Sequence, residues 1–371
     1  MAVTVTPVSS RKQHETFIRF PRQLYRNNPH YIPPLLWERR QFFDPDKNPL
    51  FEFTDVAYFL AARNGNIVGR ITAHINHRHN NYWNENTGCF GFFECIKDTE
   101  VAEALTSTAE NWLRDKKIDV IRGPFNFSTN EECGMLVSGF DERPAIMMPY
   151  GKPYYPAFME KSGYHKVQDL LAFEYANGGE IPGYLERFSK RIVKRLGITV
   201  RPLDTDNFEN EVTRALEIYN EAWAENWGFV PMTKAQFRHM AHELRPIIDP
   251  DIALIVEKNG EPVAFALALP DYNMLLRKAH GRLLPFGWIH LLFGRSRIDH
   301  IRVITLGIKD TMRNKAIDVV LYYTLFRNGY RNGYHSCEMS WILADNVRMT
   351  RALERFGAWL TKRYRIYEKK L

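Results

Sequence analysis

Cysteine is scarce in this sequence, and long apolar runs are missing. The four cysteines form no Cys-x-x-Cys pair and sit in apolar or strand-like contexts, which indicates reduced, buried thiols. No apolar run reaches the roughly 18 residues that a membrane-spanning helix needs. The first ten residues lack a basic start and an apolar core, so export is not expected. We therefore expect a cytoplasmic protein without a transmembrane segment.

Long runs of one charge are missing too. Fifty Lys and Arg against 43 Asp and Glu give a net charge of +7, and the excess is spread along the chain. This distribution favours an ordinary basic surface over a dedicated nucleic-acid or membrane interface. The strongest cluster, residues 187–195, interleaves five basic residues with apolar ones at helical spacing. We expect a helix there with one apolar stripe and one basic face.

The sequence carries one pattern twice. Its 371 residues suit two cores of about 170 to 190 residues each. Four landmarks recur in the same order: an alternating strand pattern (3–8 and 198–203), two apolar runs joined by Asn-Gly (57–76 and 252–273), Ile-Lys-Asp-Thr (96–99 and 308–311) and a helix end (159–164 and 353–358). The repeat indicates two copies of one α/β unit, at residues 1–175 and 198–371, joined by a linker helix at 176–197.

Each copy is expected to fold in the order strand, helices, hairpin, strand, helix, strand, helix, strand. Asn-Gly at 64–65 and at 259–260 predicts a tight hairpin turn, because both turn positions need positive φ angles. An amphipathic helix is expected over residues 100–117, with Asp98 or Thr99 as its cap.

This order resembles the fold of the GCN5-related N-acetyltransferase (GNAT) family. In that family the fourth strand runs into the turn Arg-x-x-Gly-x-Gly and then a helix, and residues 313–318 followed by Leu321 match this stretch. A later signature of that family resembles Asn346 together with residues 354–358. The whole chain is similar to a group of bacterial tandem proteins of this type. The resemblance implies an α/β (α+β) protein with two tandem GNAT-like domains, each a mixed central sheet flanked by helices.

The resemblance also implies a co-substrate, acetyl-CoA or another acyl-CoA, and no metal. A turn of main-chain N–H groups that opens a helix can hold the pyrophosphate. In the second copy the expected binding residues are Leu306, Gly307, Ile308, Arg313, Asn314, Lys315, Ala316, Ile317 and Asn346. Ala316 and Asp318 replace the family's glycines, and the site requires Asp318 to point to solvent. Glu100 and Glu103 occupy a shortened turn in the first copy, so we expect that copy to be non-catalytic and to shape the substrate site.

Transfer of an acyl group to an amine requires a base, because an alkylamine is mostly protonated at pH 7. The resemblance places Glu338 and Asp271 beside the cleft as candidates, and Leu353 stands where the family has a tyrosine that protonates the thiolate. The expected substrate loop contains Tyr219, Trp223, Glu225, Asn226 and Trp227. The two tryptophans, four residues apart, are equally typical of a buried helix face.

Two further groups of polar residues leave alternatives open. Asn126, Asn130 and Glu131 lie among Phe and Pro, so they either hydrogen-bond their own loop or face a ligand. Cys133 would need a partner histidine to act as a nucleophile, and the sequence identifies none. His74, His77 and His79 lack a fourth ligand at metal-binding spacing, which favours solvated or hydrogen-bonded imidazoles.

The second copy contains an insertion with the longest apolar segment, residues 283–293, between Arg282 and the pair Arg295 and Arg297. Its length suits a segment that lies on a surface or covers a pocket. Three roles are open: it covers a long acyl chain, it touches a membrane, or it packs between the domains.

Three functions follow from these observations. The first is an N-acyltransferase that moves an acetyl or longer acyl group from acyl-CoA to a small-molecule or peptide amine. The second is a non-catalytic ligand-binding protein or scaffold that keeps the GNAT fold. The third is a transferase that takes aminoacyl groups from tRNA, for which the basic helix near 187–195 would be suited.

Overall fold

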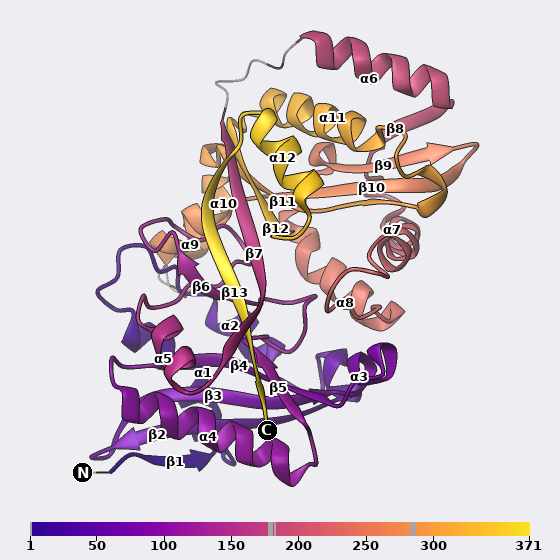
Figure 1. The fold of residues 1–371 in the computed structure, drawn as a ribbon. Coiled ribbons are helices and arrows are strands. Elements are labelled where there is room, and N and C mark those ends of the chain that lie inside the picture. The colour runs from indigo at the N-terminus through magenta and orange to yellow at the C-terminus, as the bar shows by residue number, and fades with distance from the viewer. Residues whose placement is uncertain (1, 177–180, 182, 280, 283–286) are drawn as a thin grey trace.

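The two copies follow the predicted order of elements (Figure 1). The computed structural model describes residues 2–176, 181, 183–279, 281–282 and 287–371. The first copy consists of β1 (Thr4–Pro7), α1 (Arg11–Leu24), α2 (Leu36–Phe42), β2 (Thr54–Arg63), β3 (Asn66–Asn76), α3 (His77–Trp83), β4 (Thr87–Cys95), α4 (Thr99–Asp115), β5 (Val120–Gly123), β6 (Met135–Ser138), α5 (Tyr155–Lys161) and β7 (His165–Ala176).

The second copy repeats this series. After the linker helix α6 (Gly183–Leu196), it consists of β8 (Ile198–Pro202), α7 (Phe208–Ala222), α8 (Lys234–Leu244), β9 (Ala253–Lys258), β10 (Glu261–Pro270), α9 (Asn273–Ala279), α10 (Gly287–Gly294), β11 (His300–Ile308), α11 (Ile317–Arg331), β12 (Ser336–Leu343), α12 (Val347–Arg355) and β13 (Trp359–Lys370). Gly178, Gly179 and Pro182 of the predicted linker lie outside the described residues, as do residues 283–286 of the apolar segment.

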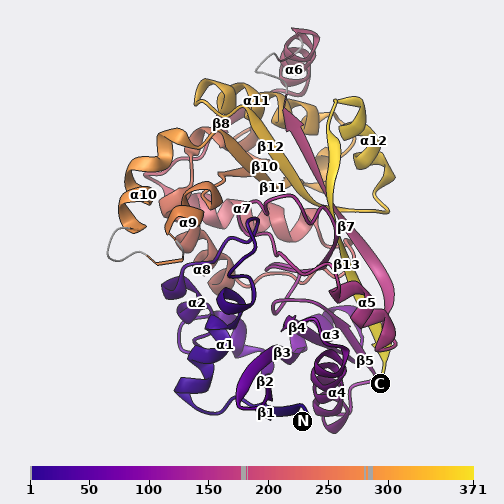
Figure 2. The ribbon, with the colours of Figure 1, turned by 90° about the vertical axis from the view of Figure 1, so that its left-hand side faces the viewer.

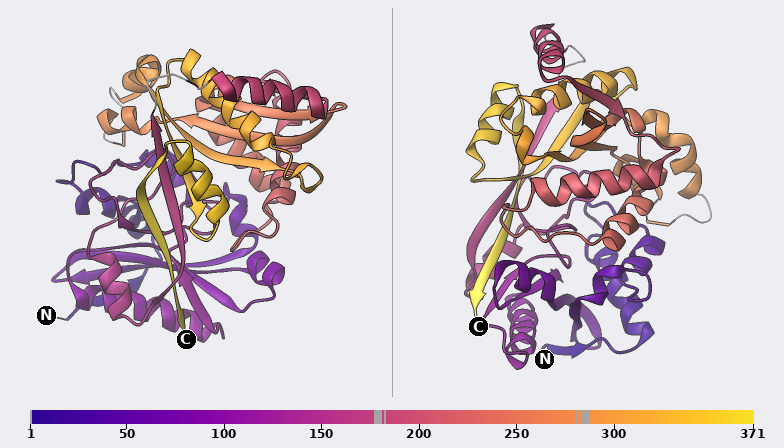
Figure 3. Two further views of the ribbon diagram at one scale, coloured as in Figure 1. Left: turned by 45° about the horizontal axis from the view of Figure 1, so that its top comes forward. Right: turned by 90° about the vertical axis from the view of Figure 1, so that its right-hand side faces the viewer.

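The two copies exchange their last strands within one continuous sheet. The strand order is β1-β2-β3-β4-β5-β13-β7-β12-β11-β10-β9-β8, with β6 paired to β13. Strand β13 of the second copy thus completes the sheet beside β5, and β7 of the first copy lies beside β12. Figures 2 and 3 show β7 and β13 running together between the copies. Neither range 1–175 nor 198–371 holds a complete sheet by itself.

Local sequence explains the hairpins and several helix starts. Asn64 and Gly65 have φ angles of 53° and 76°, and the pair at 259–260 has 53° and 82°, as the Asn-Gly turns predicted. The Asp98 side chain accepts a hydrogen bond from the Val101 N–H and begins α4, so Asp98 is the cap. Helices α3, α9 and α10, each of seven or eight residues, were not predicted.

Helices cover both faces of each half-sheet. In β2, Phe59 and Ala61 pack with α4, whereas Leu60 on the other face packs with Phe17 of α1. In β9 the alternation repeats, because Ile255 packs with α7 while its neighbours join the core around α11. Each copy therefore places its first helices on one face and its later helix on the other.

In both copies the fourth strand contains a β-bulge and separates from its parallel neighbour at the same place. Strand β4 pairs with β5 only over Thr87–Cys89, and β11 pairs with β12 only over His300–Val303. Beyond these pairs, a β-bulge lies at residues 92–93 of β4, where Phe92 has a φ of 48°, and at Ile304 of β11. The neighbouring strands diverge from this point, which leaves one edge of β4 and of β11 without a strand partner.

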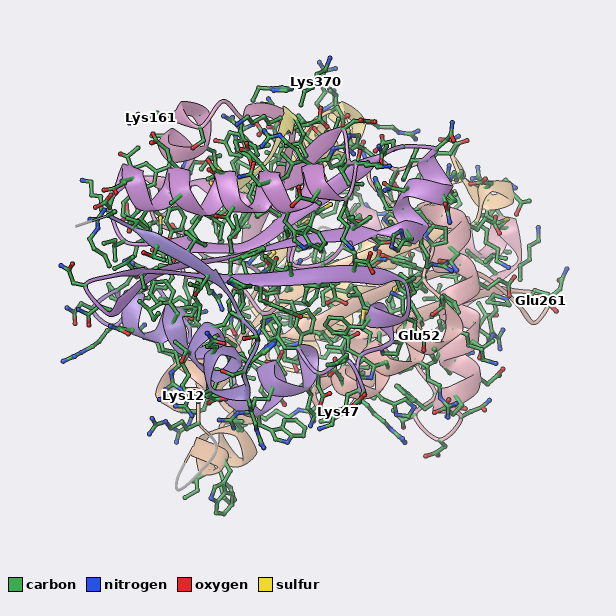
Figure 4. All side chains as sticks on the ribbon, turned by 90° about the horizontal axis from the view of Figure 1, so that it is seen from below. Lys12, Lys47, Glu52, Lys161, Glu261 and Lys370 are labelled. Carbon is green, nitrogen blue, oxygen red and sulfur yellow. The ribbon has the colours of Figure 1, made fainter. Side chains whose placement is uncertain are left out.

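The surface agrees with the charge pattern of the sequence. Exposed side chains of both signs come from both copies, among them the labelled Lys12, Lys47, Glu52, Lys161, Glu261 and Lys370 (Figure 4). Helix α6 buries Leu185 and Ile192 against the protein and exposes its basic residues, as predicted. All four cysteines are buried and unpaired. Within the described part of the chain, no helix is long and apolar enough to cross a membrane.

Candidate active site

A cavity of about 860 Å³ lies between the two copies. Its walls come from α1 and α2 of the first copy, the bulged end of β4, the loops at 124–136 and 144–151, and α8, α9 and α10 of the second copy. In each copy, the sheet face that is covered by the first helices therefore faces this cavity. Most lining side chains are apolar, with Phe, Met, Leu, Ile and Pro prominent among them. Such a volume and lining are typical of a small-molecule site.

Carboxylates gather at one part of the cavity wall. Arg39 is hydrogen-bonded to Glu132, and its Nε lies 3.7 Å from Glu38 Oε1. Glu131 lines the same wall, and no described residue donates a hydrogen bond to its carboxylate. Burial, together with the charges of Glu243 and Glu132, raises the pKa of Glu131 to about 8. Glu131 is therefore a carboxylate that can gain and lose a proton near neutral pH.

Glu94 is a second carboxylate on the wall, but the protein already engages it. The hydroxyls of Tyr25 and Tyr155 each donate to Glu94 Oε2 at 2.7 Å. Burial raises the pKa of Glu94, although the nearby Arg70 guanidinium opposes the shift. This network fixes the side chain between two tyrosines, which makes Glu131 the more accessible of the two to a ligand.

The unpaired edges of β4 and β11 differ in whether side chains hydrogen-bond their main chain. In the first copy the Phe92 N–H donates to Asn126 Oδ1 at 2.8 Å, and the Cys95 N–H donates to the Tyr155 hydroxyl at 3.1 Å. In the second copy, no side chain among the described residues hydrogen-bonds the main chain of residues 304–308. Side chains of the first copy thus hydrogen-bond its own edge, whereas no described side chain hydrogen-bonds the main chain at Leu306, Gly307 and Ile308.

The predicted phosphate turn of the second copy has the backbone of an anion-binding turn. Asn314 and Ala316 have φ angles of 60° and 64°, and α11 begins at Ile317 immediately afterwards. Alternating left-handed residues before a helix turn successive N–H groups toward one point. Asp318 is exposed, as the predicted site requires, and Lys315 donates to Thr311 O at 2.7 Å.

Further basic groups surround this turn. Arg313 donates to Ala222 O at 2.7 Å, and Arg348 donates to Asn314 Oδ1 at 2.7 Å. The Asn346 side chain accepts from the Met349 N–H at 3.1 Å and so caps α12. Arg313 Nε also lies 2.9 Å from Asp310 Oδ1, so the basic groups beside the turn are partly paired within the protein. Asn346 has a structural role beside the turn.

The matching turn of the first copy is acidic and tight. Asp98 caps α4, and Arg63 forms ion pairs with Asp98 and Glu100. Arg63 is therefore paired within the protein, and the two carboxylates would repel a phosphate at the start of α4.

The predicted substrate loop lies at the contact between the copies. The Tyr219 hydroxyl donates to Asn130 Oδ1 at 2.7 Å, and the rings of Trp227 and Phe125 lie 6.4 Å apart. Asn130 also donates to Val230 O at 3.0 Å. Asn126 and Asn130 therefore bind loops of the protein, whereas Glu131 between them faces the cavity, so both alternatives for this segment occur.

The rest of that loop packs on β11 or is exposed. Trp223 lies against Gly307, where any side chain would clash with the indole ring at 2.5 Å. Glu225 and Asn226 are exposed to solvent. Among the loop residues named from the sequence, none lines the cavity.

The two carboxylates predicted as bases are both held in buried ion pairs away from the cavity lining. Glu338 Oε2 lies 2.8 Å from Lys362 Nζ, and Glu338 also accepts from the Ser340 hydroxyl at 2.6 Å. Burial alone would raise the pKa of Glu338, but Lys362 and the nearby Arg302 outweigh it and lower the pKa.

Asp271 is buried 3.2 Å from Arg143, and burial raises the pKa of Asp271 to about 6. The geometry thus favours Glu131 over both as the group that meets a ligand.

The predicted histidines do not share a site. His74 is buried against the Phe127 ring, and His79 lies 3.2 Å from Glu85. His77 lies 3.4 Å from Asp55 at the surface. Burial raises the pKa of the Cys133 thiol to about 12, which is unsuited to a nucleophile.

Two full-length relatives decide the family. Protein YghO of Escherichia coli strain K12 is 37% identical over 365 residues, which cover 96% of this chain and 93% of that protein. The bacterial ceramide synthase of Caulobacter vibrioides is 35% identical over 377 residues, covering 100% and 98%. The chain belongs to the YghO–ceramide synthase family. No family model matches it.

Solved structures show the fold of this member of the YghO–ceramide synthase family. A tandem GNAT protein from the clavulanic acid biosynthesis pathway has a TM-score of 0.58 at 10% identity, covering 99% of this chain and 98% of the other. A GCN5-related N-acetyltransferase from Sphaerobacter thermophilus has a TM-score of 0.54 at 14% identity, covering 99% and 95%. The protein therefore has a tandem GNAT fold, which confirms the predicted fold class.

The sequence pointed to only part of the cavity in this family member. Glu131 was recognised as a polar residue in an aromatic loop, but Glu38, Arg39 and Glu243 were not recognised as its neighbours. The usable signal was the Trp-Glu-Arg-Arg stretch inside a Pro-rich segment, where charge would not be expected beside so many apolar residues.

Proposed function

We propose that this chain is an N-acyltransferase that joins a long-chain acyl group, carried by CoA, to the amine of a long-chain amino alcohol. The observation that carries the proposal is a large, mainly apolar cavity whose wall presents the partly buried carboxylate Glu131. A full-length relative named ceramide synthase supports the substrate class, since a ceramide is an amide between a fatty acyl group and such an amine.

The cavity suits alkyl chains better than a polar acceptor. Phe92 and Phe93 of β4, Met148 and Leu244 are among the apolar side chains that would surround a hydrocarbon. Each methylene moved from water to such a lining contributes about 0.8 kcal/mol. The carboxylate of Glu131 would meet the ammonium head, since a buried anion favours a cation beside it.

The acyl donor is assigned to the second copy. The turn at residues 313–317 offers main-chain N–H groups, a helix start and basic side chains to the pyrophosphate. The edge at Leu306, Gly307 and Ile308 would receive the pantetheine arm, because β11 is no longer paired with β12 there and no described side chain hydrogen-bonds its main chain. Asn346, which was also assigned to the donor, would act through its cap of α12.

The proposed step is a direct transfer. The ammonium first gives one proton to Glu131, and the free amine attacks the thioester carbonyl carbon. The new C–N bond forms, the C–S bond breaks, the electron pair leaves with the CoA sulfur, and the second proton lost by the nitrogen passes to that thiolate. The products are the amide, CoA and one proton, so the step balances without an oxidant or reductant. Glu338 and Asp271 would hold the protein framework around the cavity.

The direct test is amide formation by the purified protein. We expect palmitoyl-CoA and a long-chain amino alcohol to give the amide and free CoA, detected by mass spectrometry and a thiol reagent. Shortening either chain by one methylene should weaken its apparent affinity about fourfold, because about 0.8 kcal/mol of burial is lost. Equal activity with acetyl-CoA and palmitoyl-CoA would contradict the assignment of the cavity to alkyl chains.

The donor site has its own test. Arg313→Glu combined with Lys315→Glu should abolish the thermal stabilisation of the protein by CoA, because two cations at the phosphate turn become anions. Lys47→Glu combined with Lys161→Glu, both exposed on the first copy, is the matched control and should leave the stabilisation unchanged. An unchanged CoA shift in the first variant would place the donor elsewhere.

A further inference from the structure

Large apolar side chains are exposed where the cavity reaches the surface. We call Trp37 of α2 together with Trp288, Ile289 and Phe293 of α10 the rim patch. Their exposed fractions are 61%, 44%, 36% and 69%. Trp37 and Trp288 also line the cavity. Figure 2 shows α10 and α9 on the same flank of the molecule as α2, so the patch spans both copies at one side.

Basic residues are concentrated around the part of the patch that belongs to the second copy. The segment 273–298 contains five basic residues and no Asp or Glu. All five are exposed: Arg277, Lys278, Arg282, Arg295 and Arg297. Because the whole chain has a charge of only +7, this local excess is a concentration of positive charge around an apolar surface.

We propose that the rim patch docks on the surface of an anionic phospholipid bilayer. Aromatic and branched side chains would enter the interface between headgroups and acyl chains, while the arginines and the lysine contact phosphates. The proposed contact is peripheral, because it is made by exposed side chains of the short helices α2 and α10. The inference rests on the proposed function in one respect: the bilayer would be the source of the lipid amine that enters the cavity.

Two features favour a bilayer over a second protein. Trp37 and Trp288 belong both to the exposed patch and to the mainly apolar cavity lining, so the patch offers a lipid chain an apolar contact next to the cavity. The charged residues of α9, α10 and the segment up to Arg297 are all basic and exposed, which suits a plane of anionic headgroups, whereas the acidic Glu38 and Glu243 lie on α2 and α8 at the cavity.

The experiment is co-sedimentation of the full chain with vesicles of phosphatidylcholine, alone or mixed with phosphatidylglycerol. Wild type should bind the mixed vesicles more tightly. Ile289→Ser combined with Phe293→Ser should weaken binding to them by about tenfold or more, because two exposed apolar side chains are lost. Trp359→Ser combined with Leu360→Ser, which removes comparable exposed residues on β13, should bind like wild type.

Two double charge reversals test which surface of the protein contacts the vesicle. Arg295→Glu combined with Arg297→Glu should remove the preference for phosphatidylglycerol, whereas Arg191→Glu combined with Lys194→Glu on α6 should keep it. Loss of binding only in the α6 variant would overturn the proposal, as would equal binding by wild type and the Ile289 and Phe293 variant. A concentration-dependent dimer that the apolar substitutions dissolve, without vesicle binding, would also overturn it.

Failure of docking and failure of the proposed function are distinguishable. Glu131→Gln should bind vesicles like wild type, because it lies in the cavity wall and not on the rim. The Ile289 and Phe293 variant should lose activity on a long-chain amine embedded in vesicles but keep the wild-type activity on the same amine supplied in detergent micelles. Amide formation without vesicle binding would reject docking alone, and vesicle binding without amide formation would reject the transferase alone.

Discussion

Glu131→Gln should lower the rate of amide formation by about a hundredfold to ten-thousandfold, the range expected when a general base is removed. Glutamine has nearly the same shape but cannot accept a proton from the ammonium of the substrate. The loss should fall on kcat and not on the KM of acyl-CoA, because the donor is assigned to the turn of the second copy. Steady-state kinetics with both substrates measures this, with the exposed Glu52→Gln as the control.

The pH profile identifies which carboxylate is the base. If Glu131 acts, kcat/KM should rise with pH up to about 8, the pKa of that group, and the glutamine variant should lose this limb. If Asp271 acts, the limb should lie near its pKa of about 6. A limb near 6, or a limb near 8 that persists in the variant, would contradict the assignment of Glu131.

The melting temperature of Glu131→Gln shows whether its loss of activity comes from lost catalysis or from misfolding. The pKa of Glu131 is higher in the folded protein than its ordinary 4.5, so the fold favours the protonated form. Its contribution to stability is therefore full below about 4.5 and is lost as the pH rises through about 8. Removal of the ionisable group should leave the melting temperature at pH 8 no lower than that of wild type. A lower value would assign the rate loss to misfolding.

Local sequence was enough for most of the fold. The Asn-Gly turns, the Asp98 cap and the alternation of apolar residues act within a few positions of each other, so their meaning does not depend on distant parts of the chain. The short helices α3, α9 and α10 were missed because helices of seven or eight residues are stabilised mainly by what they pack against.

The strand exchange could not be predicted from a repeat. Either copy could have closed its sheet with its own last strand, and the same alternating residues would have been buried. Tyr175 opposite Cys337 and Tyr367 opposite Gly123 are pairs across the two copies, and only tertiary structure selects them over pairs within one copy. The cavity follows from the same arrangement, since it forms only where the first-helix faces of both copies meet.

The backbone of the turn before Ile317 could be predicted from the sequence, whereas the side chains around Glu131 could not, and phosphate binding at the turn stays a prediction. The turn before Ile317 depends on a local motif, and its left-handed residues are present although the glycines are not. The environment of Glu131 depends on Arg39 and Glu243, which lie about a hundred positions away on either side. Glu338 was predicted from its strand alone, whereas its partner Lys362 comes from the exchanged strand β13.

Lys362→Met should reduce the free energy of unfolding by about 3 to 5 kcal/mol at pH 7, the usual result of removing one partner of a buried ion pair. Both side chains are almost fully buried, and the pair joins β12 to the exchanged strand β13. Methionine keeps the apolar stem but leaves the Glu338 carboxylate without its nearest cation. Urea unfolding gives the change, and Lys370→Met, exposed on the same strand, should stay within about 0.5 kcal/mol of wild type.

The sign of the pH dependence makes this prediction specific to the ion pair. The folded protein lowers the pKa of Glu338 below 4.5, so the stability from the pair is present above 4.5 and is lost as the pH falls through the folded-state pKa. In Lys362→Met the carboxylate can protonate at a higher pH, because burial then acts without the opposing ammonium. The difference between wild type and variant should therefore shrink on acidification. A difference independent of pH would mean that methionine disturbs packing and that the charge contributes little to holding the exchanged strand.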